Sequence, residues 1–179
     1  MIIRRETGAD VPRVQAVTAA AFARPGGGEP VEPGLLAALR ACEGWLPALS
    51  LVAVDPDVDP GPDGGGAVVG HVVCTRGTAG SAPALGLGPI SVAPDRQGRG
   101  VGQALMHAVL GAADALGEPL VVLLGEPRFY GRFGFRPAAA HGVESPDPAW
   151  GDYFQARPLS AYDPAARGPF RYAAPFDEL

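Results

Sequence analysis

The chain has 179 residues, of which 47% are hydrophobic, and its formal net charge at pH 7 is −5. This length and hydrophobic content predict a single domain over residues 1–179 that can bury a sizeable core. The acidic balance argues against general nucleic-acid binding, because phosphate neutralisation needs a basic face. No apolar run approaches the roughly 20 residues of a membrane helix, and charges begin at the fourth residue, so neither a membrane span nor a signal peptide is expected. Cys42 and Cys74 lack metal-ligand spacing and are expected as reduced thiols of a cytoplasmic protein.

The first part of the chain predicts a strand followed by two helices. Residues 1–5 (MIIRR) predict a short strand. Thr7 and Asp10 are start signals for a helix over residues 7–22, in which apolar side chains recur at helical spacing. A stretch rich in proline and glycine ends this helix, and a second short helix is predicted over residues 34–44, closed by a glycine.

The middle of the chain predicts three strands, one long helix and a further strand. Strands are predicted over residues 49–54 and 67–75, joined by a solvated loop, and over residues 84–94. Apolar positions then recur every three to four residues in a helix over residues 100–117. Residues 119–125 (PLVVLLG) form the near-continuous apolar run that is typical of a strand buried on both faces.

The C-terminal part is rich in proline and polar residues. It follows a sharp turn over residues 128–137, and its predicted strands cover residues 153–159 and 170–176. One central strand–helix–strand unit, flanked by further strands, predicts an α+β fold with a mixed sheet.

The stretch from Arg96 to Gly102 places two arginines and three glycines at the start of the long helix. The first N–H groups of a helix have no partner within it, and the helix dipole adds partial positive charge there. Glycines let an anion approach the backbone, so this turn predicts a phosphate or pyrophosphate site. Two familiar phosphate loops do not fit: no Gly-Lys-Ser/Thr follows, and Gly-x-Gly-x-x-Gly fails because Gln103 or Leu105 occupies its last position. A glycine-rich turn without a ligand is the alternative.

Two motifs in register carry a family resemblance. Residues 97–102 (QGRGVG) match Gln-x-x-Gly-x-Gly, and residues 130–135 (YGRFGF) match Tyr-x-x-x-Gly-Phe. In their strand–turn–helix–strand setting they resemble the GNAT superfamily of acetyl-CoA-dependent N-acetyltransferases, sharply over residues 85–137 and in architecture before that. The resemblance implies a three-layer α/β/α fold. Its mixed, mostly antiparallel sheet would splay between the fourth and fifth strands and carry helices on both faces.

The same resemblance implies roles for individual residues. The strand segment of Ile90, Ser91 and Val92 would bind the pantetheine arm of acetyl-CoA, and a free N–H there would polarise the thioester carbonyl. Tyr130 matches the family tyrosine that protonates the leaving thiolate; its alternative is a packing role beside neighbouring phenylalanines. No metal is implied. The pyrophosphate would lie on the amides of Gln97, Gly98, Arg99, Gly100, Val101 and Gly102.

The sequence leaves the general base open. Leu123 and Glu126 stand where family members often have Asn and Ala, and the strand before the turn lacks the glutamate that some members use as a base. Glu126, His71 or an ordered water are the alternatives.

The resemblance places the acceptor between the loop joining the first two helices and the C-terminal strands, here residues 23–34 and 141–154. We expect a small-molecule amine or a peptide or protein amine there, with no nucleic-acid or membrane partner, and a homodimer is left open. Ordinary solvated loops are the alternative for most of these residues. Carboxylates and aromatic rings suited to a cationic amine are Glu29, Glu32, Glu144, Asp147, Asp152, Trp150, Tyr153 and Phe154.

The function expected is an N-acetyltransferase that moves the acetyl group from acetyl-CoA to a primary amine by direct attack in a ternary complex. One alternative is a non-catalytic acyl-CoA-binding or regulatory domain with the same fold. Another is an acyltransferase for a longer acyl chain, which needs a wider pocket near Ile90 and Phe129.

Overall fold

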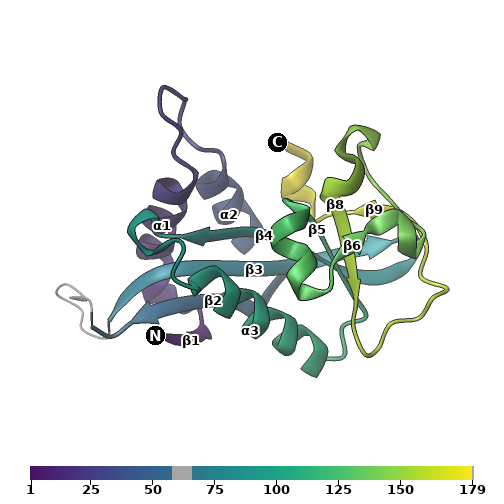
Figure 1. Cartoon of the computed structure of the whole chain (residues 1–179), viewed down its shortest axis with the longest axis horizontal. Coiled ribbons are helices and arrows are strands. Elements are labelled where there is room, and N and C mark those ends of the chain that lie inside the picture. The colour runs from purple at the N-terminus through teal and green to yellow at the C-terminus, as the bar shows by residue number, and fades with distance from the viewer. Residues whose placement is uncertain (58–65, 179) are drawn as a thin grey trace.

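The computed structural model describes residues 1–57 and 66–178, and its main element is one mixed sheet (Figure 1). The strand order is β1-β2-β3-β4-β5-β8-β6, and β9 pairs with both β3 and β7. The strands are β1 Ile2–Arg5, β2 Trp45–Asp55, β3 Ala67–Ala79, β4 Ala82–Val92, β5 Leu120–Leu124, β6 Arg136–Pro137, β7 Val143–Glu144, β8 Phe154–Pro158 and β9 Gly168–Arg171. The α-helices are α1 Val11–Phe22, α2 Glu32–Ala41, α3 Val101–Ala115 and α4 Pro127–Tyr130.

Helices cover both faces of this sheet, as predicted (Figure 1). Val14 of α1 and Leu36 of α2 share a buried cluster with Val52 of β2. Leu105 of α3 shares a different cluster with Leu51, the neighbour of Val52. Because successive strand residues point to opposite faces, α3 lies across the sheet from α1 and α2.

The sheet opens between β4 and β5. The two strands are parallel, and within the described residues their register contains Leu85 with Val121 and Gly86 with Val122. By contrast, β4 pairs with β3 as far as Val92. The part of β4 that follows Gly86 therefore has a free edge on the side away from β3, which is the splay predicted between the fourth and fifth strands.

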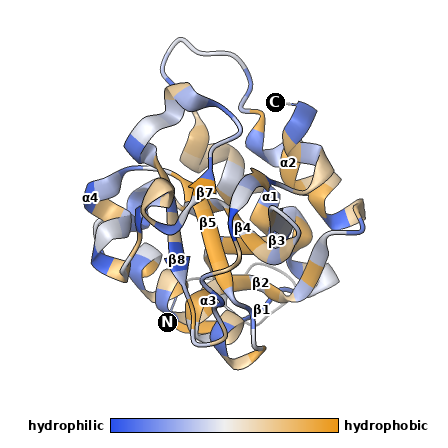
Figure 2. Cartoon of the chain, turned by 90° about the vertical axis from the view of Figure 1, so that its right-hand side faces the viewer, coloured by the Kyte–Doolittle hydropathy of each residue, from blue (hydrophilic) through white to orange (hydrophobic). Residues whose placement is uncertain are grey.

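β5 is the most deeply enclosed strand on the far side of this opening. Leu120, Val121 and Val122 are fully buried and Leu123 is 1% exposed. Figure 2 shows β5 as a hydrophobic strand through the middle of the molecule. The prediction of a strand buried on both faces is confirmed, because Val121 and Leu123 lie in one buried cluster and the alternating residues Leu120 and Val122 lie in another.

Two strands are longer than predicted. β3 continues to Ala79 because its last residues form a tight hairpin with β4, in which Gly80 takes a φ of +58°, and also pair with β9. β2 begins at Trp45, in spite of Pro47, and includes a register shift between Trp45 and Ser50. Glycine and proline made these segments resemble loops in the sequence.

Other boundaries also differ from the predictions. The second helix begins at Glu32, two residues earlier than expected. The strand predicted over residues 170–176 is wrong after Arg171, where β9 ends. Pro175 has no N–H for a ladder, and the N–H of Phe176 bonds the carbonyl of Ala173 in a 3-10 turn. Residues 58–65 of the loop predicted between β2 and β3 lie outside the described residues.

Candidate active site

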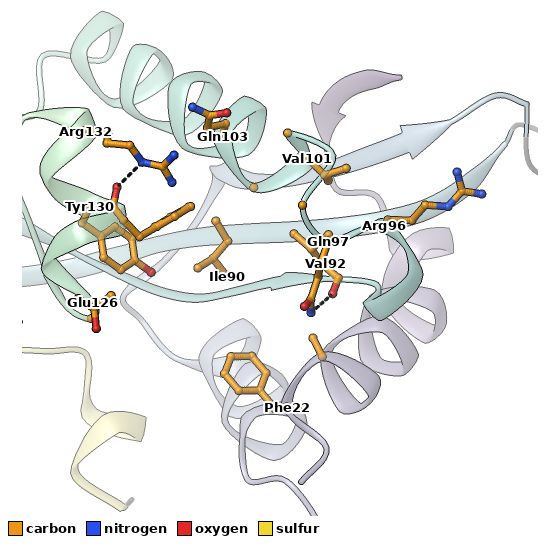
Figure 3. Close-up of a pocket in the computed structure, with 16 residues that line it drawn as sticks. Phe22, Ile90, Val92, Arg96, Gln97, Val101, Gln103, Glu126, Tyr130 and Arg132 are labelled. Carbon is orange, nitrogen blue, oxygen red and sulfur yellow. Dashed lines mark hydrogen bonds between the residues drawn. The ribbon is translucent and has the colours of Figure 1, made fainter. Parts of the chain in front are cut away.

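A cavity of about 550 Å³ opens beside the free edge of β4 (Figure 3). We call it the turn cavity, because the glycine-rich turn and the start of α3 form one of its walls. It is lined by Ala21, Phe22, Ile90, Val92, Arg96, Gln97, Gly98, Gly100, Val101, Gly102, Gln103, Gly125, Glu126, Phe129, Tyr130 and Arg132.

The backbone of the turn is open to this cavity, with no side chain over Gly98 or Gly100. Gly98 and Gly100 have φ values of +72° and +85°, the left-handed region that favours glycine, and a Cβ at either position would meet no atom within 4 Å. Gly100 is the N-cap of α3, so the first N–H groups of a 15-residue helix follow directly. The side-chain amide of Gln97 donates to the carbonyl of Val92 at 3.2 Å and ties the turn to the end of β4. Open glycine backbone and the start of a long helix therefore lie together at this wall of the cavity.

The free edge of β4 carries backbone groups that need partners. The N–H of Ala93 donates to the carbonyl of Val69 in β3. Because the N–H and C=O groups of successive strand residues point to alternate edges, those of Ser91 face β3, and those of Ile90 and Val92 face the opening. The Ser91 hydroxyl lies 3.1 Å from the hydroxyl of Thr18 under α1. The structure therefore places Ile90 and Val92 on the cavity and Ser91 away from it.

Two arginines line the turn cavity, and neither is Arg99. Arg96 is also held by Asp55 at 3.0 Å and by Asp95 at 3.2 Å. Arg132 stacks over the ring of Phe129, with 5.0 Å from its guanidinium carbon to the ring centroid. Sequence reasoning missed Arg132, although it lies inside the second motif.

Tyr130 stands on the cavity wall opposite the free strand edge (Figure 3). Its ring packs edge-on against Phe129, with centroids 4.9 Å apart, and against Phe135 at 6.0 Å. Burial raises the pKa of the Tyr130 phenol to about 12, so the hydroxyl stays protonated at neutral pH. The ring also lies against the backbone of Gly125, where a side chain would collide with it. Tyr130 therefore both packs against the neighbouring rings and lines the cavity.

The two candidate bases lie in different settings. Glu126 lines the turn cavity, but its carboxylate accepts a hydrogen bond from the N–H of Arg128 at 3.2 Å and caps α4. His71 is fully buried, with Nε2 2.8 Å from the hydroxyl of Ser50 and 3.5 Å from Glu6. Burial lowers the pKa of His71, and His71 lines neither this cavity nor the next.

A second cavity of about 840 Å³ shares Phe22, Ile90 and Tyr130 with the first. We call it the aromatic cavity. Of the acceptor residues predicted from sequence, Glu32 and Trp150 line it and the other six do not. Its remaining lining residues are Leu35, Leu87, Gly88, Pro89, Leu124, Pro146, Phe170, Arg171, Tyr172, Ala174, Phe176 and Asp177.

The model of a family described as an acetyltransferase (GNAT) domain matches residues 47–137, about half of the chain and the whole turn cavity apart from α1. The chain belongs to the GNAT acetyltransferase family. It is 30% identical to the N-acetyltransferase YhbS of Escherichia coli K12 over 164 residues, which are 89% of this chain and 88% of YhbS. The N-acetyltransferase YjhQ of the same organism is 34% identical over 122 residues, 65% of this chain and 62% of YjhQ.

Two solved GNAT structures resemble the whole chain. The crystal structure of Escherichia coli YhbS in complex with CoA has a TM-score of 0.83 at 27% identity, and covers 98% of this chain and 91% of that one. A GNAT acetyltransferase from Brucella melitensis in complex with acetyl-CoA has a TM-score of 0.75 at 32% identity, and covers 98% and 97%. The predicted GNAT fold and the predicted enzyme class, an acyltransferase, are confirmed.

The described parts of this GNAT chain are residues 1–57 and 66–178. No helix in those ranges has the length and apolar character to cross a bilayer. No cluster of three or more His, Cys, Asp or Glu side chains in the same ranges is arranged to hold a metal ion.

Proposed function

We propose that the protein transfers the acetyl group of acetyl-CoA to a primary amine by direct attack in a ternary complex. The observation that carries this proposal is the meeting of the two cavities at Phe22, Ile90 and Tyr130. A thioester held along the turn cavity and an amine held in the aromatic cavity come together at these side chains. Direct attack then needs no covalent enzyme intermediate.

The residues of the turn cavity fit acetyl-CoA. Open backbone at Gly98 and Gly100, at the start of α3, suits the pyrophosphate. Arg132 adds positive charge on the same cavity, whereas Arg96 is paired with Asp55 and Asp95. The backbone groups of Ile90 and the N–H of Val92, which face away from β3, suit the amide groups of pantetheine, which would extend the sheet like an added strand.

In the reaction the neutral amine nitrogen forms a bond to the thioester carbonyl carbon, and the carbon–sulfur bond breaks to release a thiolate. A proton leaves the nitrogen and one is gained by the sulfur. Burial raises the pKa of the Tyr130 phenol to about 12, so the phenol keeps its proton at neutral pH. Tyr130 therefore acts as a hydrogen-bond donor that stabilises the developing thiolate. The proton that leaves the nitrogen balances the proton that the sulfur gains.

We assign deprotonation of the incoming ammonium to solvent in the cavities. Glu126 is engaged in capping α4, and His71 is buried beside Ser50 and Glu6, away from both cavities. The rate should therefore rise with pH as the free amine becomes more abundant.

Thiol release from acetyl-CoA, measured with a panel of amines, tests this proposal. The expected result is amine-dependent release that falls by tenfold or more in Tyr130→Phe with little change in the affinity for acetyl-CoA. If CoA raises the melting temperature by binding the folded state but no amine supports release, the non-catalytic acyl-CoA-binding alternative is the correct one.

A further inference from the structure

We propose that the acceptor is a monoamine with an aromatic or bulky apolar body, and that the aromatic cavity selects it over polyamines and amino sugars. This rests on the proposed function and goes beyond it by naming the class of acceptor. Three features of the cavity support this class of acceptor: the rings that form it, its size, and the charges along it.

Aromatic side chains from distant parts of the chain converge on this cavity. Phe170 and Tyr172 pack edge-on with centroids 4.6 Å apart, and Tyr172 packs on Phe176 at 4.8 Å. Trp150 and Phe22 contribute two more rings from other elements. Such a wall binds flat apolar groups through contact area and ring geometry.

The position of Tyr172 ties this wall to the opening of the sheet. A Cβ on Gly86 would lie 2.6 Å from Cδ1 of Tyr172, so the ring lies directly on the backbone of β4 at that point. Gly86 is paired with Val122, next to where β4 and β5 separate. The aromatic wall therefore begins at the root of the opening and extends to Tyr130, which both cavities share.

The volume and composition of the cavity suit a body larger than a simple alkylamine. At about 840 Å³ it lies within the usual range of small-molecule sites. A small amine such as ethylamine would leave most of the apolar wall in contact with water and would gain little from binding.

Charge along the cavity favours one positive charge in the ligand. Its charged lining residues are Glu32, Asp177 and Arg171, which sum to a formal charge of −1. Within the described residues neither carboxylate has an ion-pair partner. Carboxylates beside aromatic rings hold an ammonium group well. A polyamine would have to bury further ammonium groups against the apolar wall without partners, which is costly.

The test compares kcat/KM for 2-phenylethylamine, ethylamine and spermidine at saturating acetyl-CoA. We expect 2-phenylethylamine to exceed ethylamine by tenfold or more and spermidine to be no better than ethylamine. Equal values for all three amines, or a preference for spermidine, would overturn the acceptor class while leaving the proposed function intact. Absence of turnover with every amine would instead count against the proposed function.

Variants of the lining residues test which side chains cause the preference for 2-phenylethylamine. Trp150→Ala should lower the ratio between 2-phenylethylamine and ethylamine at least threefold, whereas Leu116→Ala, which removes an exposed apolar side chain elsewhere, should not change it. Glu32→Gln should raise KM for 2-phenylethylamine severalfold, and Glu43→Gln, at an exposed site away from both cavities, should not. An unchanged ratio in Trp150→Ala would contradict the proposal.

The same cavity could instead seat a long acyl chain, and octanoyl-CoA distinguishes that occupant. With 2-phenylethylamine as acceptor, we expect octanoyl-CoA to react more slowly than acetyl-CoA because both groups compete for the aromatic wall. A higher kcat/KM for octanoyl-CoA would assign the wall to the acyl chain and overturn the proposal.

Discussion

Replacing Gly125 with alanine should displace the Tyr130 ring without unfolding the protein. Gly125 does not occupy the left-handed region, so its backbone suits alanine. A Cβ there would lie 2.9 Å from Cδ2 of Tyr130, 3.1 Å from Cζ and closer still to Cε2. The backbone of Gly125 is held on both sides, by the carbonyl of Tyr153 at 2.9 Å and the side-chain amide of Gln155 at 2.9 Å. The ring must therefore move, since the strand end is fixed.

The size of the effect follows from this geometry. Carbon atoms in contact normally lie about 3.5–4.0 Å apart, so the edge of the Tyr130 ring nearest to Gly125 has to shift by more than about 1 Å. A displacement of that size at a reacting centre costs about 10²-fold in rate, or ~2.7 kcal/mol of transition-state stabilisation. We expect kcat/KM to fall by about that factor, with CoA affinity changed little because the turn lies elsewhere.

Steady-state thiol release measures this effect, and Gly111→Ala is the matched control. Gly111 lies in α3 with nothing within 4 Å of its would-be Cβ, so this variant should keep full activity and gain up to about 1 kcal/mol in helix stability. If the cost arises through the phenol, Gly125→Ala should have much less effect when added to Tyr130→Phe. A Gly125→Ala enzyme within twofold of wild type would refute the reasoning.

Three further predictions concern the turn, the phenol and a buried carboxylate. Gly100→Val forces a φ of +85° on a β-branched residue, a strain of about 1–3 kcal/mol. This variant should lose CoA binding in calorimetry while circular dichroism still shows a folded protein. Unchanged affinity for CoA would contradict the assignment of the pyrophosphate to this turn. Because burial raises the pKa of Tyr130 to about 12, kcat should show no descending limb between pH 7 and 10, and a fall in that range that disappears in Tyr130→Phe would contradict this. Burial alone would raise the pKa of Glu6, but hydrogen bonds from His71, Ser50 and Arg40 outweigh it and lower that pKa from 4.5 to about 2. The free energy of unfolding should thus fall as pH drops from 4.5 toward 2, and denaturant titrations of Glu6→Gln should show a shallower fall.

Much of the central unit could be predicted from sequence because its signals are local. The apolar run of β5, the helical spacing of α3 and the left-handed glycines of the turn each depend on neighbouring residues. The splay of the sheet came from the family resemblance, since nothing in the spacing of residues 85–92 shows where a neighbouring strand departs.

The acceptor side was predicted less well because its parts meet through distant pairing. Tyr172 and Phe176 reach the cavity only because β9 pairs with the end of β3, where Thr78 is opposite Arg171. Neither the long end of β3 nor the 3-10 turn after β9 has a strong sequence signal. Similarly, His71 looked available as a base, and only the structure shows that it is buried beside Ser50 and Glu6.

A crystal structure of this chain with CoA tests the central claim most directly. The account predicts pyrophosphate oxygens on the backbone N–H groups of residues 97–102, pantetheine along Ile90 and Val92, and the thiol within hydrogen-bond distance of the Tyr130 hydroxyl. A CoA whose pyrophosphate avoids the turn, or whose thiol lies away from Tyr130, would contradict it.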